Sequence, residues 1–213
     1  MLCTGESLLL LSIDARRGTL RAPLWLGCSL VGAELAESHA LGLIYFDGEF
    51  LRPRSGMATR HGRHPGANAI ASILARSRGP TRPIDLVVER YRHTTEIVAD
   101  RLMAEGILDR RRIRSLGIPS YRYDIIDIEY MTSAIERLHH AADGPRGPAG
   151  TVETAEQARE DAVFGGLAYL ALLARPYFPG ADNKLAREYL RSLSEAHWIC
   201  QAVSSGIAAL RLV

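Results

Sequence analysis

Histidine is the residue type in this chain best suited to metal binding or acid–base chemistry, and seven are present. His61 and His64 lie three residues apart in a glycine-rich stretch, and His139 and His140 are adjacent near the expected end of a helix. Zinc sites need clustered cysteine, histidine or carboxylate ligands, and neither pair has a cysteine nearby or an HExxH pattern. We therefore expect no metal site.

Motifs typical of phosphate, dinucleotide and ester chemistry are also missing from the sequence. It contains no Walker A loop, no GxGxxG after a strand and no GxSxG elbow. Asp124 and Asp127 resemble a carboxylate pair, but Asp127 is better explained as the N-cap of a following helix. The sequence predicts a protein that is not an enzyme and binds no cofactor.

The segment Ile97–Ile125 is the strongest candidate for a binding function. It is predicted to form a helix that ends at Gly106, followed by two strands that alternate polar and apolar residues around a turn at Gly117–Ser120. The hairpin tip carries no cation and consists of Leu116, Gly117, Ile118, Pro119, Ser120 and Tyr121. Arginines occupy its base and strands: Arg110, Arg111, Arg112, Arg114 and Arg122.

This hairpin is compatible with several functions. A helix followed by a two-stranded wing is the layout of winged-helix nucleic-acid binders, but such a wing needs cations at its tip to contact phosphates. An apolar tip above arginines suits an anionic membrane, with the tip in the acyl boundary and the arginines at the headgroups. The hairpin could equally join copies of a soluble oligomeric scaffold. It is also compatible with a tip that folds back on the protein above a solvated arginine face.

Composition indicates one domain, residues 1–213, with a sizeable core. The chain has 213 residues, 47% of them hydrophobic, and a formal net charge of +2, so attraction to anions requires local clustering. Three cysteines, an odd number without metal-like spacing, are typical of a reducing compartment. The longest apolar run, Ala162–Ala174, is shorter than the roughly 20 residues of a membrane span, and the N-terminus does not resemble a signal peptide.

Local patterns predict a mainly α fold, in which apolar central helices are surrounded by amphipathic helices with one or two small β-hairpins. The apolar helices are expected at Leu24–Ala40 and, opened by a capping box of Thr154 and Gln157, up to Ala174. The other helices are expected at Leu2–Ile13, Ala67–Ala75, Ile84–Arg92, Asp127–Ala141, Lys184–Leu193 and Glu195–Leu210.

Finer features follow from the same patterns. Asp47 and Gly48 predict a two-residue hairpin turn between strands at Leu43–Phe46 and Glu49–Arg52. The stretches at about 53–66 and 143–150 are rich in glycine and proline and are expected to be flexible. One face of the helix Asp127–Ala141 is expected to be buried, and it consists of Ile128, Met131, Ile135 and Leu138.

Three stretches carry a family resemblance. Glu6–Gly18 is a leucine run followed by an acidic turn that ends in glycine, Leu30–Phe46 is a helix followed by a strand, and Asp85–Tyr123 contains the helix, glycine and hairpin. Together with Arg187–Leu210, which contains Trp198, they resemble the Golgi phosphoprotein 3 family, eukaryotic Golgi adaptors that bind phosphatidylinositol 4-phosphate, and its bacterial relatives. The resemblance implies an α-rich fold and a hairpin used for membrane contact or self-association.

The resemblance also implies a headgroup site that is retained in part. The family pocket uses a tryptophan before the first apolar helix, an arginine in that helix, and two basic residues three apart before the hairpin. Trp25 lies near the tryptophan position and Arg92 matches the first of the two basic residues, whereas Val31 and Thr95 replace the other cations. Cations that could compensate are Arg21, Arg90 and His93.

The sequence therefore predicts a cytoplasmic protein that associates peripherally with the inner face of the membrane. It would bind anionic phospholipid through Trp25, Arg92 and the hairpin, with little preference for one headgroup and a steep dependence on salt. A protein cargo and a homo-oligomer formed through the hairpin are further possible partners, and nucleic acid is the less favoured alternative.

Overall fold

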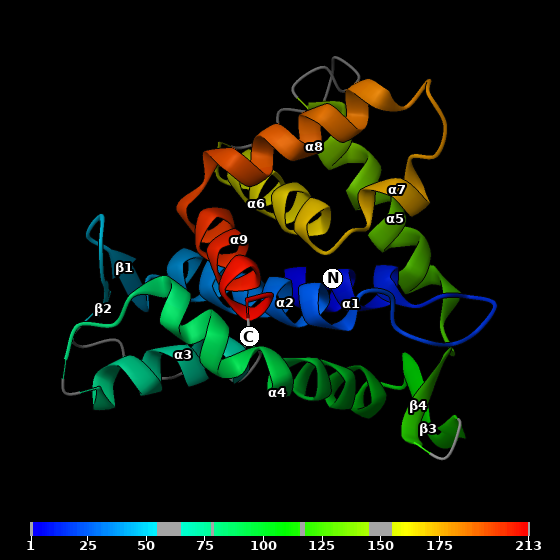
Figure 1. Ribbon diagram of the computed structural model, residues 1–213, viewed down its shortest axis with the longest axis horizontal. Helices are drawn as coiled ribbons and strands as arrows, with labels where there is room; N and C mark the ends of the chain where they lie inside the picture. The colour runs from blue at the N-terminus through cyan, green and yellow to red at the C-terminus, as the bar shows by residue number, and fades with distance from the viewer. Residues whose placement is uncertain (1, 55–64, 78, 116–117, 145–154, 213) are drawn as a thin grey trace.

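The fold is mainly α-helical, as predicted (Figure 1). The computed structural model describes residues 2–54, 65–77, 79–115, 118–144 and 155–212. The helices are α1 Thr4–Ser12, α2 Pro23–Ala40, α3 Pro65–Arg76, α4 Pro83–Ala104, α5 Ile128–Asp143, α6 Ala155–Leu170, α7 Ala174–Tyr177, α8 Lys184–Ala196 and α9 Trp198–Leu210. Within these ranges the strands form two antiparallel hairpins: β1 Ile44–Phe46 with β2 Leu51–Pro53, and β3 Leu108–Ser115 with β4 Ile118–Ile125.

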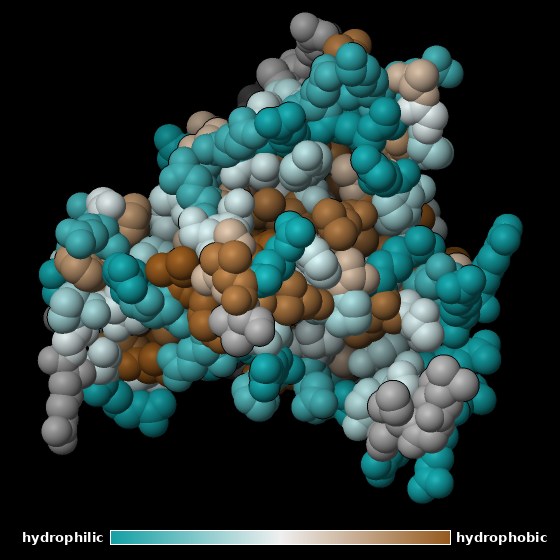
Figure 2. Space-filling model, in the orientation of Figure 1, coloured by the Kyte–Doolittle hydropathy of each residue, from teal (hydrophilic) through white to brown (hydrophobic). Residues whose placement is uncertain are grey.

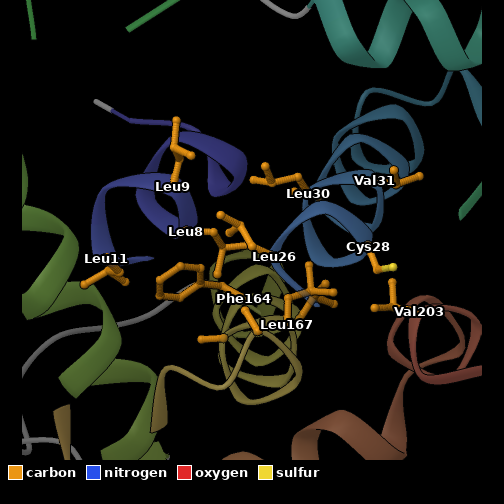
Figure 3. Close-up of a cluster of buried hydrophobic side chains, with 14 of the residues drawn as sticks. Leu8, Leu9, Leu11, Leu26, Cys28, Leu30, Val31, Phe164, Leu167 and Val203 are labelled. Carbon is orange, nitrogen blue, oxygen red and sulfur yellow. The ribbon is translucent and has the colours of Figure 1, made fainter. Parts of the chain in front are cut away.

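Helix α2 is the centre of the structure and contacts α1, α3, α4, α6 and α9. It is apolar on most of its circumference, so it can be buried on several sides at once. Figure 3 shows Leu8 of α1, Leu26 of α2, and Phe164 and Leu167 of α6 gathered in one cluster, and all four are fully buried. The expected core from the two apolar helices is confirmed.

Two glycines set the spacing around α2. A Cβ built on Gly27 would come within 2.4 Å of the carbonyl oxygen of Tyr91 in α4. A Cβ on Gly32 would come within 2.6 Å of Leu167 in α6 and 2.7 Å of Val203 in α9. Both positions therefore require glycine, and they fix opposite sides of α2 against different helices.

Several predicted helix ends are wrong. The helix predicted to end at Arg92 continues to Ala104 as α4. The polar side chain of Thr94 does not interrupt it, because its buried hydroxyl donates to the Arg90 carbonyl at 3.1 Å within the helix. Helix α6 ends at Leu170 rather than Ala174, and Leu172 has a positive φ of 62°. Helix α8 runs on to Ala196, so the break before α9 falls at residue 197.

Both predicted hairpin turns also need correction. The first loop contains four residues, because Phe46 pairs with Leu51 and the Asp47 carboxylate accepts hydrogen bonds from the N–H groups of Glu49 and Phe50 at 3.1 and 2.7 Å. In the second hairpin, Ser115 pairs with Ile118, so residues 118–120 belong to β4 and not to the turn. The expected tip residues Leu116 and Gly117 lie outside the described residues.

Other predicted features fall on parts of the chain that the structure does not describe. These are most of the segments 53–66 and 143–150, His61, His64 and the capping residue Thr154. Within the described ranges, no helix is long and apolar enough to cross a membrane.

Candidate functional site

The acidic turn between α1 and α2 lies against the second hairpin. The carboxylate of Asp14 accepts hydrogen bonds from the N–H groups of Arg16 and Arg17 at 3.0 and 3.2 Å, and these bonds are the main reason that the pKa of Asp14 is lowered. Gly18 ends the turn with φ +64°, and its carbonyl oxygen accepts a hydrogen bond from the N–H of Tyr123 at 2.7 Å. The turn therefore contacts the outer edge of β4 at this residue.

The register of β3 and β4 gives the hairpin two different faces, because directly paired residues share a face. We call one the arginine–tyrosine face, in which Arg110 pairs with Tyr123 and Arg112 pairs with Tyr121. At the base of the hairpin, Arg110 forms an ion pair with Asp100 of α4 at 2.8 Å. The Arg110 guanidinium also lies 4.8 Å from the centre of the Tyr121 ring. Arg110 thus holds the hairpin against α4.

The opposite face carries an ion-pair network. Arg111 lies 3.2 Å from Asp109 and 3.3 Å from Asp124, and Arg122 lies 3.5 Å from Asp124. The arginines of the hairpin are therefore not one uniform ring of cations. Those on this face are partly neutralised, and Arg110 is paired with α4.

Four exposed arginines at this end of the molecule, which we call the arginine cluster, form no ion pair with any residue in the described ranges: Arg16, Arg17, Arg112 and Arg114. Two come from the α1–α2 turn and two from β3, and the turn reaches the hairpin through β4, where Gly18 accepts the hydrogen bond of Tyr123. Figure 2 shows mainly hydrophilic side chains around the hairpin and the α1–α2 loop. The arrangement creates local positive charge in a chain whose net charge is nearly zero.

Arg92, the arginine predicted to bind the lipid headgroup, is exposed on α4. Its Nε donates to the Tyr91 hydroxyl at 2.8 Å, and its guanidinium lies 5.5 Å from the centre of that ring. Glu89 and Glu96, also exposed, lie three and four residues away, which places both on the same side of the helix. Arg92 is therefore accessible, but it sits between two carboxylates.

The predicted partners of Arg92 lie elsewhere. Arg90 makes a bidentate ion pair with Glu34 of α2, with a closest distance of 2.9 Å, and is only 16% exposed. Arg21 pairs with Asp14 at 3.1 Å, next to the arginine cluster. Val31, where the resemblance predicts a family cation, is fully buried.

Trp25 faces away from α4. Seven residues separate it from Gly32, so the two share a face of α2, and Gly32 packs against α6 and α9. Gly27, two residues from Trp25, points about 200° away and contacts Tyr91 of α4. The structure therefore does not bring Trp25 together with Arg92, and Trp25 is partly buried against the core.

One small cavity between α1, α2 and α4 has the wrong charge for an anionic headgroup. Its polar lining is mostly acidic, with Glu6, Glu34 and Glu37. Glu6 Oε1 lies 2.8 Å from Arg101 Nε, and Glu34 is paired with Arg90. Burial raises the pKa of Glu34, and the nearby Arg90 opposes that rise.

Sequence reasoning missed two exposed apolar residues near the hairpin. Ile126 is 63% exposed, and its N–H donates to the Ile107 carbonyl at 2.9 Å, where the hairpin begins. Ile128 was expected on the buried face of α5 but is 68% exposed. Ile128 is the first residue of α5 and precedes the helical turn that packs on the core. Helical periodicity therefore did not predict that its side chain is exposed.

Two neighbouring histidines near the end of α5 make contacts within the fold. His139 makes an edge contact with Phe178 at 4.9 Å, and His140 Nδ1 lies 3.4 Å from Asp161. Among the residues that the structure describes, no group of three or more His, Cys, Asp or Glu side chains could hold a metal ion.

Fold and site together define a mainly α protein that presents an arginine-bearing hairpin beside an acidic turn. The chain matches the family model described as Golgi phosphoprotein 3 (GPP34) over residues 5–210, and it belongs to that family. No curated protein matches the chain significantly.

Proposed function

We propose that this member of the Golgi phosphoprotein 3 family is a non-enzymatic, peripheral membrane adaptor that binds anionic phospholipids from the cytoplasmic side. The observation that supports this most is the contact between Gly18 and Tyr123 of β4, which places the turn that carries Arg16 and Arg17 at the same end of the molecule as the hairpin arginines. The contact joins two of the stretches that resemble the family, so both contribute to one basic surface.

The binding is expected to be reversible. Each arginine near an anionic surface contributes about 1 kcal/mol, so the four members of the arginine cluster contribute about 4 kcal/mol. Exposed apolar residues at the hairpin base, Ile126 and Ile128, add up to about 1.5–3 kcal/mol each when they are buried in the acyl boundary. With two of them, a total of about 8 kcal/mol corresponds to micromolar affinity.

Headgroup selectivity is expected to be low. Val31 is buried where the family has a cation, Arg90 is paired with Glu34, and Arg92 lies between two glutamates. The arginine cluster therefore supplies charge without an enclosed pocket, and we propose little preference for phosphatidylinositol 4-phosphate over other anionic lipids.

Nucleic-acid binding is the second candidate, and the hairpin offers it less support. The arginines of a DNA-binding wing must be free to contact phosphates. Here Arg110, Arg111 and Arg122 are paired with carboxylates of the hairpin or of α4, so only Arg112 and Arg114 among the described hairpin arginines are free to contact phosphates.

Vesicle sedimentation tests the proposal. Wild-type protein should pellet with phosphatidylcholine vesicles that contain phosphatidylserine or phosphatidylinositol 4-phosphate, and not with phosphatidylcholine alone. Binding should fall steeply as salt rises. Arg16→Ser with Arg17→Ser should weaken binding about tenfold or more, whereas Arg175→Ser on α7, also exposed, should not.

The hairpin tip needs its own variant, Leu116→Ser with Ile118→Ser, assayed against vesicles and duplex DNA and by sedimentation velocity. Loss of pelleting without loss of thermal stability would support membrane contact. A lower melting temperature would show that the tip is part of the core. A change to a smaller oligomer would favour the scaffold, and wild-type binding to DNA but not to vesicles would favour the nucleic-acid alternative.

A further inference from the structure

The outer edge of β4 is covered at its base by Gly18 and lacks an N–H at Pro119 near the tip. The N–H of Tyr123 points away from β3, because it donates to Gly18. In an antiparallel ladder, residues in such a pair direct both backbone groups outward, and every second pair behaves in the same way. Arg112 with Tyr121 and Arg114 with Pro119 are therefore also outward-facing pairs. Pro119 has no N–H to offer at this edge, and at this position it costs no ladder bond.

The outer edge of β3 is open towards the tip. The same register directs the N–H and C=O groups of Arg110, Arg112 and Arg114 away from β4. The N–H of Arg110 is satisfied by the carboxylate of Asp109 at 2.8 Å. The outward groups of Arg112 and Arg114 have no hydrogen-bond partner in the part of the chain that the structure describes.

We propose that this open edge binds an extended acidic segment of a partner protein, which adds to β3 as a third strand. Backbone hydrogen bonds to Arg112 and Arg114 would supply affinity, as in other cases of strand addition. Asp or Glu at alternate positions would pair with the two exposed guanidiniums on the arginine–tyrosine face. The proposal rests on the edge and its charge, and does not depend on lipid binding.

A second copy of this chain fits the edge poorly. The outward-facing residues of β3 are the even-numbered ones, so antiparallel pairing of two β3 strands must join even with even. Arg110, Arg112 and Arg114 of both copies would then share one face, directly opposite each other. Like charges in opposed positions destabilise a sheet. Arginines at this edge thus oppose self-pairing and favour an acidic strand.

Segments of this chain outside the described residues are also unsuited to the edge by composition. Residues 55–64 contain no acidic residue, and residues 145–154 contain only Glu153. A membrane surface would satisfy the guanidiniums, but its phosphates cannot reproduce the in-plane pattern of donors and acceptors that a strand presents. The occupant that satisfies both kinds of group is an extended acidic peptide.

Fluorescence anisotropy with a labelled, blocked peptide of alternating glutamate and valine tests the proposal on the full chain. The matched peptides carry lysine in place of glutamate, or N-methyl groups on the amides that would pair with β3. We expect binding of the glutamate peptide, and at least about tenfold weaker binding of the other two. Amide hydrogen exchange across residues 108–115 should slow when the glutamate peptide binds.

Variants of β3 test separately what the arginine charges and the outward backbone N–H groups contribute to peptide binding. Arg112→Glu with Arg114→Glu should lower affinity for the glutamate peptide at least about tenfold and raise it for the lysine peptide, and Arg175→Glu should change neither. Arg112→Pro removes an outward N–H without breaking a β3–β4 ladder bond, so it should bind the peptide more weakly than Arg112→Gln, which keeps the N–H.

Three results would overturn the proposal. Equal binding of the N-methylated peptide would show simple charge attraction. Equal protection of β3 amides by phosphatidylserine vesicles would assign the edge to the membrane. Self-association that Arg112→Pro abolishes would assign it to a second copy. Should a variant fail to fold by circular dichroism, the N-methylated peptide and hydrogen exchange on the wild-type protein still decide.

Discussion

Gly27 of α2 lies directly against the backbone of Tyr91 in α4, where a Cβ on the glycine would come within 2.4 Å of the tyrosine carbonyl oxygen. Seven residues further along the same face of α2, Glu34 forms its ion pair with Arg90. One face of α2 thus holds α4 by close backbone contact and by a nearly buried charge pair. This arrangement fixes where the exposed face of α4, with Arg92, is directed.

Gly27→Ala should be strongly destabilising, because the obstacle is backbone and cannot rotate away. We expect a loss of about 3 kcal/mol, or roughly 6–12 °C in melting temperature, by calorimetry. Gly5→Ala in α1 is the matched control, since its Cβ would meet only ordinary contacts at 3.7 and 3.8 Å. It should leave stability unchanged or raise it by about 0.5–1 kcal/mol. Equal effects of the two variants would contradict the close α2–α4 contact.

Gly18→Ala should release the acidic turn from the hairpin. Its φ is +64°, and a Cβ would come within 2.8 Å of the Tyr123 carbonyl oxygen and 2.7 Å of Arg122 Cγ. Gly106 has a similar φ of +73°, but a Cβ there would meet nothing within 4 Å. Gly106→Ala therefore measures only the cost of a left-handed backbone conformation at an alanine, about 1–2 kcal/mol. We expect Gly18→Ala to lose more stability than Gly106→Ala in urea denaturation. We also expect faster amide exchange at Tyr123 in Gly18→Ala alone; unchanged exchange there would show that the turn does not depend on this contact.

The apolar framework could be predicted because its signal is local. Leu26–Leu35 and the stretch around Phe164 are apolar on all sides, and burial is the stable outcome for such helices in water. Helix ends were less predictable. The hydroxyl of Thr94 bonds within α4, just after Arg92, where the first of two predicted helices was expected to end.

The candidate site could be predicted only in part, because it depends on contacts between distant segments. Arg16 and Arg17 read as an ordinary turn until Gly18 is seen to bond Tyr123. The resemblance places Trp25 and Arg92 in one pocket, yet Trp25 shares the face of α2 that carries Gly32 and packs on α6 and α9, whereas α4 packs on the face that carries Gly27. In the sequence those two glycines are merely small residues in an apolar helix.

Removing one partner of the Glu34–Arg90 pair should cost more than replacing both. Arg90→Met leaves the carboxylate of Glu34, which is 6% exposed, without its counter-charge and should lose about 3–5 kcal/mol at neutral pH. The double variant Glu34→Gln with Arg90→Met removes both charges and should recover a large part of that loss. Urea denaturation of the wild type, both single variants and the double variant gives the coupling energy. Additive losses would show that the pair is not coupled.

His197 should make stability fall in mild acid. It is the N-cap of α9, and its Nδ1 accepts a hydrogen bond from the N–H of Ile199 at 3.2 Å, which requires that nitrogen to be unprotonated. Burial, and then the neighbouring His39, lower the pKa of His197 below its ordinary value of 6.5; burial, and then Arg54, lower that of His39. The unfolded chain therefore binds more protons than the folded chain just below pH 6.5, so stability is complete above that value and declines as pH falls through it.

His197→Asn keeps a capping oxygen without a titrating ring, so its free energy of unfolding should fall less than that of the wild type between about pH 8 and about pH 5.5. Losing the cap itself costs about 0.5–2 kcal/mol, which sets the size of the difference to be measured by urea denaturation. Parallel pH profiles for the two proteins would show that His197 is not the titrating group.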